Sequence, residues 1–362
     1  MRAGSASSHR RHTRGFAFAF VAVAFLLTLT AHPVAAASPN AYTVTALVSN
    51  NGEPGTTVDT QLLNGWGLVA GPTTPWWVAD NGADVSTLYA ANGTKLALIV
   101  TVEGAPTGIV FNGNTTSFPV GTTNAAARFI FATESGTIAG WTQALGTVAE
   151  VKVDSSSAGA IYKGLAIATT ASGPQLYATD FHNARVDVFN RTWMPVTTSG
   201  GFMDPILPAG YAPFGIQTIG TRVFVTFAKQ GSAADEVDRM SLGFVDAFYA
   251  DGNLLARVAT RGMLNAPWGL AMAPDSFGMF GGDLLVGNFG DGRIHAYREM
   301  PNGRFVYQGA LQDGSGQMIA IDGLWALQFG HGALNNGPVD TLFFTAGPNG
   351  EADGLFGSIT AG

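Results

Sequence analysis

Oxygen-bearing side chains recur at the ends of short apolar runs along the chain, and they have the clearest capacity for chemistry. Carboxylate and amide oxygens are the ligands that hard divalent cations such as Ca²⁺ prefer, and separate loops can each supply one. Four such residues are candidate ligands for Ca²⁺ or another divalent cation: Asp80, Glu134, Asp180 and Asn288. A cation held there could polarise a carbonyl or activate water, as a hydrolase requires.

Glu134 is the strongest candidate among these four. It lies in the segment 133–136, where a turn aspartate is expected, and glutamate is poorly suited to capping such a turn itself. Asp180 has a structural alternative, because an aspartate can accept backbone N–H groups of its own turn. Asn183 and Arg185 would then stabilise the surrounding strands, and the sequence leaves both roles open.

A second set of residues is suited to binding a ligand rather than a metal. Its members are Asn81, His182, Lys229, Asn349, Glu351, Trp66 and Trp268. His182 could act as a general base, because imidazole titrates near neutrality, or it could be an ordinary exposed loop residue. The two tryptophans could stack on a flat ligand or wedge neighbouring structural units together.

The elements that position these residues are repeated along the chain. A signature of an aromatic or polar residue, a glycine and an aliphatic residue occurs at 64–68, 105–109, 162–165, 212–216, 266–270 and, more loosely, 322–327. Each copy is followed by two further apolar runs, whose alternation and β-branched content predict strands. Repeats of roughly 40 to 57 residues with three or four strands each are typical of propeller blades. Six copies therefore predict an all-β, six-bladed propeller.

The ends of the chain predict how the ring closes. The last repeat reaches the C-terminus after only three strands, whereas the β-rich segment 42–48 has no blade of its own. This segment can supply the missing outer strand and protect the terminal edges. We therefore expect one propeller domain over residues 38–362.

The N-terminal segment predicts export. Arg10, Arg11 and Arg14 precede an apolar run over 16–29, and small residues follow at 35–37. This pattern is typical of a signal peptide, residues 1–37, cut before Ser38. The alternative is a membrane anchor, but the run is shorter than the 18 or so residues that a spanning helix needs. A secreted or periplasmic protein without a membrane span is expected.

Composition narrows the partners and the chemistry. Four of the 18 Lys and Arg residues and none of the 25 Asp and Glu residues lie in 1–37, so the mature chain has 14 basic against 25 acidic residues, a net charge of −11. Nucleic acid and anionic membranes are disfavoured as partners. The chain has no cysteine, which excludes disulfides and thiol catalysis. We expect a monomer.

Two segments carry a resemblance to a known family. Residues 176–189 resemble an NHL repeat, with Asp180, Asn183, Arg185 and Phe189 in place, and residues 285–297 resemble a variant of it. With 42–49 and 64–68, the mature chain is similar to a family of uncharacterised, exported bacterial six-bladed propellers. Some members carry a PEP-CTERM-type sorting tail, which the C-terminus 358–362 lacks. The resemblance implies the fold and export, and no catalytic residue.

Two classes of function follow for the expected propeller. In such folds, the loops entering the innermost strand and those joining the second strand to the third open on one face, where ligands usually bind. The first hypothesis is a binding or scaffold protein that recognises a small molecule, glycan or protein through this acidic face. The alternative is a metal-dependent hydrolase or lactonase, as in propeller lactonases of the gluconolactonase type.

Overall fold

The computed structural model describes residue 1, residues 39–231 and residues 235–362. The predicted signal peptide, residues 1–37, lies outside the described residues except for Met1. Among the described residues, no helix is long and apolar enough to cross a membrane. Strands, turns and a few short 3-10 helices make up the described part of the chain from residue 39 onward.

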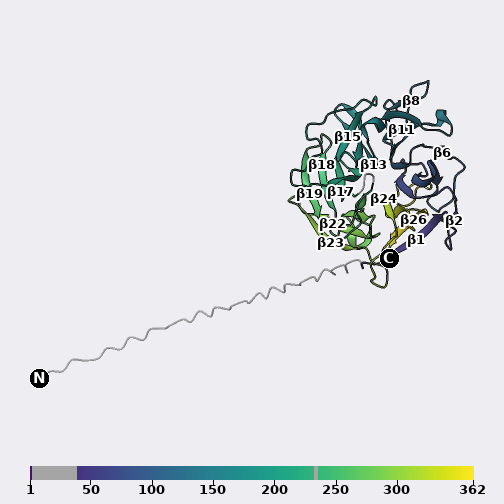
Figure 1. The fold of residues 1–362 in the computed structure, drawn as a ribbon. Coiled ribbons are helices and arrows are strands. Elements are labelled where there is room, and N and C mark those ends of the chain that lie inside the picture. Colours follow the sequence, from purple (N-terminus) through teal and green to yellow (C-terminus); the bar gives the residue numbers. More distant parts are fainter. Residues whose placement is uncertain (2–38, 232–234) are drawn as a thin grey trace. The chain divides into compact units, whose positions relative to one another are not determined.

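Six antiparallel sheets surround a central axis as the blades of a β-propeller, which confirms the predicted fold (Figure 1). From the innermost strand outward, blade 1 is β3 (Gly65–Val69), β4 (Trp76–Asp80), β5 (Val85–Tyr89) and β6 (Val100–Thr101). Blade 2 is β7 (Pro106–Phe111), β10 (Phe129–Thr133), β11 (Thr137–Trp141) and β12 (Glu150–Asp154), and blade 3 is β13 (Tyr162–Thr170), β14 (Gly173–Asp180) and β15 (Arg185–Asn190). Blade 4 is β16 (Tyr211–Ile219), β17 (Arg222–Lys229), β18 (Phe244–Tyr249) and β19 (Leu254–Thr260). Blade 5 is β20 (Pro267–Met272), β21 (Leu284–Asn288), β22 (Ile294–Glu299) and β23 (Phe305–Ala310).

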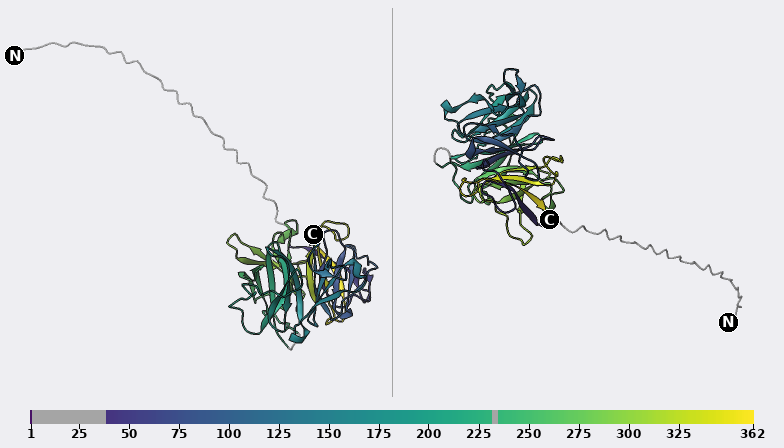
Figure 2. Two further views of the ribbon diagram at one scale, coloured as in Figure 1. Left: turned by 90° about the horizontal axis from the view of Figure 1, so that it is seen from above. Right: turned by 90° about the vertical axis from the view of Figure 1, so that its right-hand side faces the viewer.

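Blade 6 contains both ends of the propeller. It consists of β24 (Leu324–Phe329), β25 (Leu342–Ala346), β26 (Leu355–Ala361) and β1 (Tyr42–Ser49), with the short β2 (Thr57–Val58) beside β1. β1 pairs antiparallel with β26, from Tyr42 opposite Ala361 to Ser49 opposite Leu355. The purple β1 lies against the yellow C-terminal strands in all three views (Figures 1 and 2). The predicted closure by an N-terminal strand is therefore confirmed.

Tyr42 anchors this closing strand to the neighbouring blade. Its ring packs against Phe277 and Phe280, with ring centroids 4.9 and 6.1 Å away. Its hydroxyl donates to the carbonyl of Phe277 and accepts from the N–H of Phe280, both at 3.2 Å. Closure of the ring thus combines backbone pairing with burial of an aromatic ring between blades 5 and 6.

The glycine of the repeated signature is required by the close approach of the innermost strands. These strands form a closed ring of neighbours in the order β3, β7, β13, β16, β20 and β24. A Cβ added at Gly67 would lie 2.3 Å from the carbonyl oxygen of Thr107, and one added at Gly215 would lie 2.1 Å from that of Trp268. Such distances leave no room for a side chain, so the signature marks the inner wall of the propeller.

The hydrophobic core is divided between the blades. Of the seven buried apolar clusters that the described residues form, six lie between neighbouring blades. The seventh lies on the central axis and includes Trp66, Phe181, Phe214 and Trp325. The channel is therefore closed by aromatic side chains, and a cavity of only about 30 Å³ remains beneath them.

Candidate binding site at the channel mouth

One position in every blade faces the same end of the channel. It is the residue that follows the second strand, whose backbone N–H donates to the carbonyl just before the innermost strand. The N–H of Asn81 donates to Asn64 at 3.2 Å, that of Glu134 to Ala105 at 3.0 Å, and that of Gln230 to Gly210 at 3.0 Å. In the other three blades the N–H groups of Phe181, Phe289 and Gly347 form the equivalent bonds. We call these six residues the mouth ring.

Three of the predicted metal ligands occupy the position one residue earlier, and each is fully buried within its own blade. Oδ2 of Asp80 accepts from the N–H and the hydroxyl of Thr87, at 2.9 and 2.8 Å. Nδ2 of Asn288 donates to the carbonyl of Met263 at 2.8 Å and to Asp291 at 3.0 Å. These contacts hold turns and strands together, while Oδ1 of Asp80 and Oδ1 of Asn288 are buried without a hydrogen-bond partner in the described chain.

Asp180 shows the structural role that the sequence left open. Its Oδ1 accepts from the N–H groups of Ile161 and Asn183, each at 3.2 Å, and its Oδ2 accepts from Nδ2 of Asn183 at 2.7 Å. Arg185 lies 3.4 Å from Oδ2. The aspartate thus caps its own turn and is neutralised by a neighbour in its blade.

The register explains why Glu134 differs from the other three predicted ligands. In blade 2 the buried turn position is held by Thr133, whose hydroxyl accepts from the N–H of Thr137 at 3.1 Å. Glu134 is one residue further on, in the mouth ring. The four predicted ligands are therefore not brought together, and among the described residues no group of three or more His, Asp or Glu side chains is arranged to hold a metal.

A chain of polar contacts runs around half of the mouth, through blades 6, 1, 2 and 3. Nδ2 of Asn64 donates to Oε2 of Glu351 at 2.6 Å and to Oδ1 of Asn81 at 3.2 Å. Nδ2 of Asn81 donates to Oε2 of Glu134 at 3.0 Å. Oε1 of Glu134 then pairs with Nζ of Lys163 at 2.5 Å. We call these five residues the polar arc. Its bonds hold in place side chains that come from different strands and loops.

Lys163 is the most deeply placed charge of the polar arc. Its side chain is only 3 % exposed, and its ammonium lies 4.9 Å from the ring of Trp66. A buried charge requires a partner, and Glu134 supplies it. An ammonium has three donors, however, and Glu134 accepts only one of them. No other acceptor in the described chain bonds to Nζ of Lys163.

Aromatic rings form the floor beneath the polar arc. Trp66 stacks on Trp325 with ring centroids 3.7 Å apart, and Trp325 stacks on Phe289 at 4.0 Å. Nε1 of Trp325 donates to Oδ1 of Asn64 at 2.9 Å, which ties the floor to the arc. Trp66 is 1 % exposed and so cannot stack on a ligand, whereas Trp268 and Phe289 are partly exposed. The tryptophans therefore close the channel, and their rings also pack against one another across blades 1, 5 and 6.

Glu236 adds a carboxyl group with altered acidity. It follows β17 on a hairpin in which Gln230 bridges Glu236 and the N–H of Val237 donates to the carbonyl of Lys229 at 2.9 Å. Burial raises the pKa of Glu236 to about 7, although the charge of Lys163 opposes the shift. Desolvation by the surrounding loops also raises the pKa of Glu351, although part of this residue is exposed to solvent. The mouth therefore contains a carboxyl that titrates near neutrality.

The remaining predicted ligand residues lie apart from the polar arc. The side chain of Asn349 turns to Asp353 at 3.4 Å, and Nζ of Lys229 donates to the carbonyl of Ala209 at 3.3 Å. His182 is exposed, and its carbonyl accepts from Nε2 of Gln230. Of the predicted residues, the structure thus brings together Asn81, Glu134 and Glu351.

Sequence analysis overlooked Asn64, Lys163 and Glu236 as site residues. Lys163 could have been found, because it is the one charged side chain at the position before the signature glycine or its Ala326 counterpart. The other five residues at that position are Trp66, Thr107, Phe214, Trp268 and Trp325. No comparable signal marks Glu236, whose placement depends on the conformation of a loop.

The fold and the site define the protein as a six-bladed β-propeller with a polar mouth over a closed channel. The chain is 33 % identical over 332 residues to uncharacterized protein R648 of Acanthamoeba polyphaga mimivirus, covering 86 % of this chain and 78 % of that protein. It belongs to the same family as that protein. The relative is viral, which corrects the expectation of a bacterial family. No protein-family model matches the chain.

Solved structures support the fold. A structural genomics protein of unknown function from Bacteroides thetaiotaomicron superposes with a TM-score of 0.57 at 12 % identity, over 88 % of this chain and 76 % of that one. A PQQ-bound aldose sugar dehydrogenase from Streptomyces coelicolor gives 0.52 at 15 % identity, over 90 % and 99 % of the two chains. At these identities the likeness shows the fold alone.

Proposed function

We propose that the protein binds a small polyhydroxylated molecule, such as the end of a glycan, at the channel mouth. The observation that carries this proposal is the polar arc, in which carboxylate acceptors lie beside amide or ammonium donors above an aromatic floor. A hydroxyl group both donates and accepts, so neighbouring hydroxyls suit such a combination of donors and acceptors. A few fixed polar groups beside apolar rings are the usual composition of small-molecule sites.

The charge balance of the mouth favours a neutral ligand over an anionic one. Glu134, Glu236 and Glu351 face a single cation, Lys163, whose charge acts on Glu236 and Glu351 as well. An acidic cleft repels anions at a distance. Partly exposed faces of Trp268 and Phe289 offer apolar contact to the carbon skeleton of a sugar.

The metal-dependent hydrolase that the sequence also suggests has less support. Three of its four expected ligands, Asp80, Asp180 and Asn288, each form hydrogen bonds at their own turns, and no described group of three or more His, Asp or Glu side chains is arranged to hold a metal. The metal itself stays a prediction, which elemental analysis of the purified protein tests directly. A stoichiometric divalent ion would favour the hydrolase.

We also propose that the protein is exported and monomeric. The basic, apolar and small-residue pattern of residues 1–37 supports cleavage before Ser38. N-terminal sequencing of protein recovered from outside the producing cell should begin at Ser38. Light scattering should give the mass of one mature chain.

Saturation-transfer NMR with neutral monosaccharides and inositol tests the binding function, with gluconate as an anionic comparison. We expect signals from the neutral compounds that Glu351→Gln and Glu236→Gln weaken at least tenfold in affinity. Glu53→Gln, in an exposed loop outside the site, is the matched control. The proposal is wrong if no neutral polyol binds, if gluconate alone binds, or if both site variants leave binding unchanged.

A further inference from the structure

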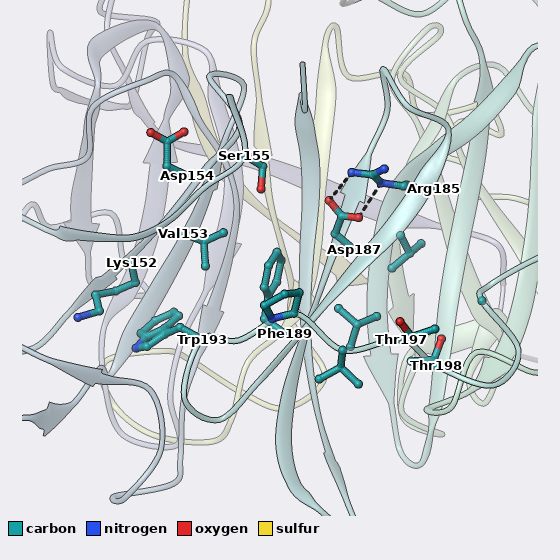
Figure 3. A pocket seen from close by; sticks show the side chains of 15 residues that line it. Lys152, Val153, Asp154, Ser155, Arg185, Asp187, Phe189, Trp193, Thr197 and Thr198 are labelled. Atoms are coloured by element: carbon teal, nitrogen blue, oxygen red, sulfur yellow. Dashed lines mark hydrogen bonds and ion pairs between the residues drawn. The ribbon is translucent and has the colours of Figure 1, made fainter. Parts of the chain in front are cut away.

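A groove of about 680 Å³ lies at the outer edge of blade 3, away from the channel mouth. Figure 3 shows it between β12 of blade 2, which carries Val153 and Asp154, and the segment containing Thr197 and Thr198. The ring of Phe189 lies between these two sides. The groove follows β15, the outermost strand of the one blade whose sheet has three strands in the described chain.

Blade 1 shows what fills the equivalent position elsewhere in the ring. Along the outer edge of β5, the N–H of Leu96 donates to the carbonyl of Leu88 at 2.9 Å. Further along the same edge, β6 places Val100 opposite Ser86 and Thr101 opposite Val85. The edge of β5 is therefore covered along its whole length by the chain that follows it.

Blade 3 repeats only the first half of this arrangement. The N–H of Val196 donates to the carbonyl of Val188 at 2.8 Å, and Phe189 bridges Pro195, as the equivalent residues of blade 1 do. No described segment then pairs with the outer edge of Arg185 and Val186. The groove lies where a counterpart of β6 would be.

The chain that would form this strand is held by blade 4 instead. The N–H groups of Gly200 and Phe202 donate to the carbonyls of Asp251 and Gly252, each at 3.0 Å. A Cβ at Gly200 would lie 2.1 Å from the backbone nitrogen of Asn253, so the glycine is required for this approach. The sequence therefore favours the packing of this segment on blade 4, because it has a glycine at position 200.

The exposed edge presents backbone groups in the order that a further strand needs. In an antiparallel ladder, alternate residues direct both N–H and C=O to the same side. The carbonyl of Val188 points outward to Val196, so the N–H and C=O of Val186 point outward as well. In the described chain no backbone group pairs with those of Val186 on this side.

The walls and the rim of the groove indicate what the added strand would contain. Val153, Phe189 and Val196 supply apolar walls. At the rim, Asp187 is paired with Arg185 at 2.7 Å (Figure 3), whereas the carboxylate of Asp154 receives only the backbone and hydroxyl of Ser156. Those bonds lower the pKa of Asp154, which stays ionised and without a cationic partner in the described chain.

We propose that this groove binds a short extended peptide of a partner protein, which adds antiparallel to β15 as the fourth strand of blade 3. A β-branched residue would lie opposite Val186, and a basic residue near its C-terminal end would face Asp154. Addition of a strand to an open sheet edge combines main-chain hydrogen bonds with pockets for alternate side chains.

Two pentapeptides test the proposal on the full mature protein. Residues 99–103 of blade 1 contain the strand that covers β5, so the acetylated, amidated peptide Ile-Val-Thr-Val-Glu copies it. The second peptide, Ile-Val-Thr-Val-Lys, replaces the glutamate by lysine. We expect the lysine peptide to bind at least tenfold more tightly by fluorescence polarisation and to protect the amide of Val186 from hydrogen exchange. Asp154→Asn should remove the preference for lysine.

Val186→Pro removes the outward N–H without breaking the ladder to β14, and should weaken binding at least tenfold. Val186→Thr keeps the N–H and is the matched control. N-methylation of the first valine of the lysine peptide, the counterpart of Val100 that would lie opposite Val186, tests the same bond with an unaltered protein. Unchanged affinity with the methylated peptide, protection of amides elsewhere, or dimerisation through this edge in place of peptide binding would each overturn the proposal.

Discussion

The ammonium of Lys163 lies 2.5 Å from Oε1 of Glu134, and the two residues come from neighbouring blades. Lys163 is the second residue of the innermost strand of blade 3, whereas Glu134 follows the second strand of blade 2. The pair therefore joins two blades at the channel mouth and at the same time presents charged groups to it.

Removing the charge of Lys163 should destabilise the propeller. Lys163→Met leaves the carboxylate of Glu134 without its partner, and breaking a fully buried pair costs roughly 3–5 kcal/mol. Because Glu134 is 27 % exposed, we expect a smaller loss of about 2–3 kcal/mol in the free energy of unfolding, measured by urea denaturation. The double variant with Glu134→Gln should recover at least half of it. A double variant as unstable as Lys163→Met would show that the unpaired carboxylate of Glu134 is not the cause of the lost stability.

The acidity of Glu236 predicts a pH dependence of stability. Its pKa is raised to about 7, so the folded state holds the proton more tightly than the unfolded state does. Its contribution is fully present below about pH 4.5 and is lost as the pH rises through 7. We expect unfolding free energy to fall between pH 5 and pH 8.5 by no more than about 3 kcal/mol, since the side chain is partly exposed.

Glu236→Gln should make that part of the profile less steep, whereas Glu53→Gln should leave it unchanged. Part of the fall should remain, because burial also raises the pKa of Asp80 and raises that of Asp246 to about 8. Denaturation curves at several pH values decide the matter. A profile of Glu236→Gln that still falls like the parent would assign the titration to another group, such as Glu351.

Two buried aspartates should respond in opposite ways to the same substitution. The pKa of Asp80 is raised well above its ordinary value by burial, so a neutral side chain suits its site. Asp80→Asn should therefore keep or increase stability at pH 8. Asp180→Asn should lose about 2 kcal/mol or more, because the carboxylate accepts several hydrogen bonds and faces Arg185. Thermal melts of both variants at pH 8 measure the contrast, and equal losses would contradict it.

The sequence was sufficient for the fold because the inner wall imposes a local, repeated demand. In five of the six blades a glycine precedes the aliphatic residue, as at Gly164 and Gly215, because a side chain there would clash with the neighbouring innermost strand. This requirement can be recognised in the repeat alone. It was harder to predict which polar residues face the channel mouth and which are buried in a blade. Thr133 and Glu134 differ by one position, yet one turns into the blade and the other to the mouth. Periodicity alone does not fix that register when a threonine stands where blades 1 and 3 have an aspartate.

Glu236 was beyond sequence reasoning for a different reason. It comes after β17, and no local motif indicates that it lies at the mouth. Glu351 was predicted, although it adopts a positive φ of 67°, which a non-glycine residue rarely does. Asn64, which donates to Glu351 and accepts from Trp325, likewise acquires its role only when blades 1 and 6 meet.

The inner-wall glycines provide the most direct test of the fold. Gly215→Ala would place a methyl group 2.1 Å from the carbonyl oxygen of Trp268, which is backbone and cannot swing aside. The innermost strands of blades 4 and 5 would have to separate, and overpacking of this kind costs about 3 kcal/mol or more. Gly314→Ala is the matched control, since a Cβ there meets nothing within 4 Å and its φ is not positive. Chemical denaturation should show a large loss for the first variant and almost none for the second. Equal stability of the two variants would mean that the blades are not packed as closely as this geometry requires.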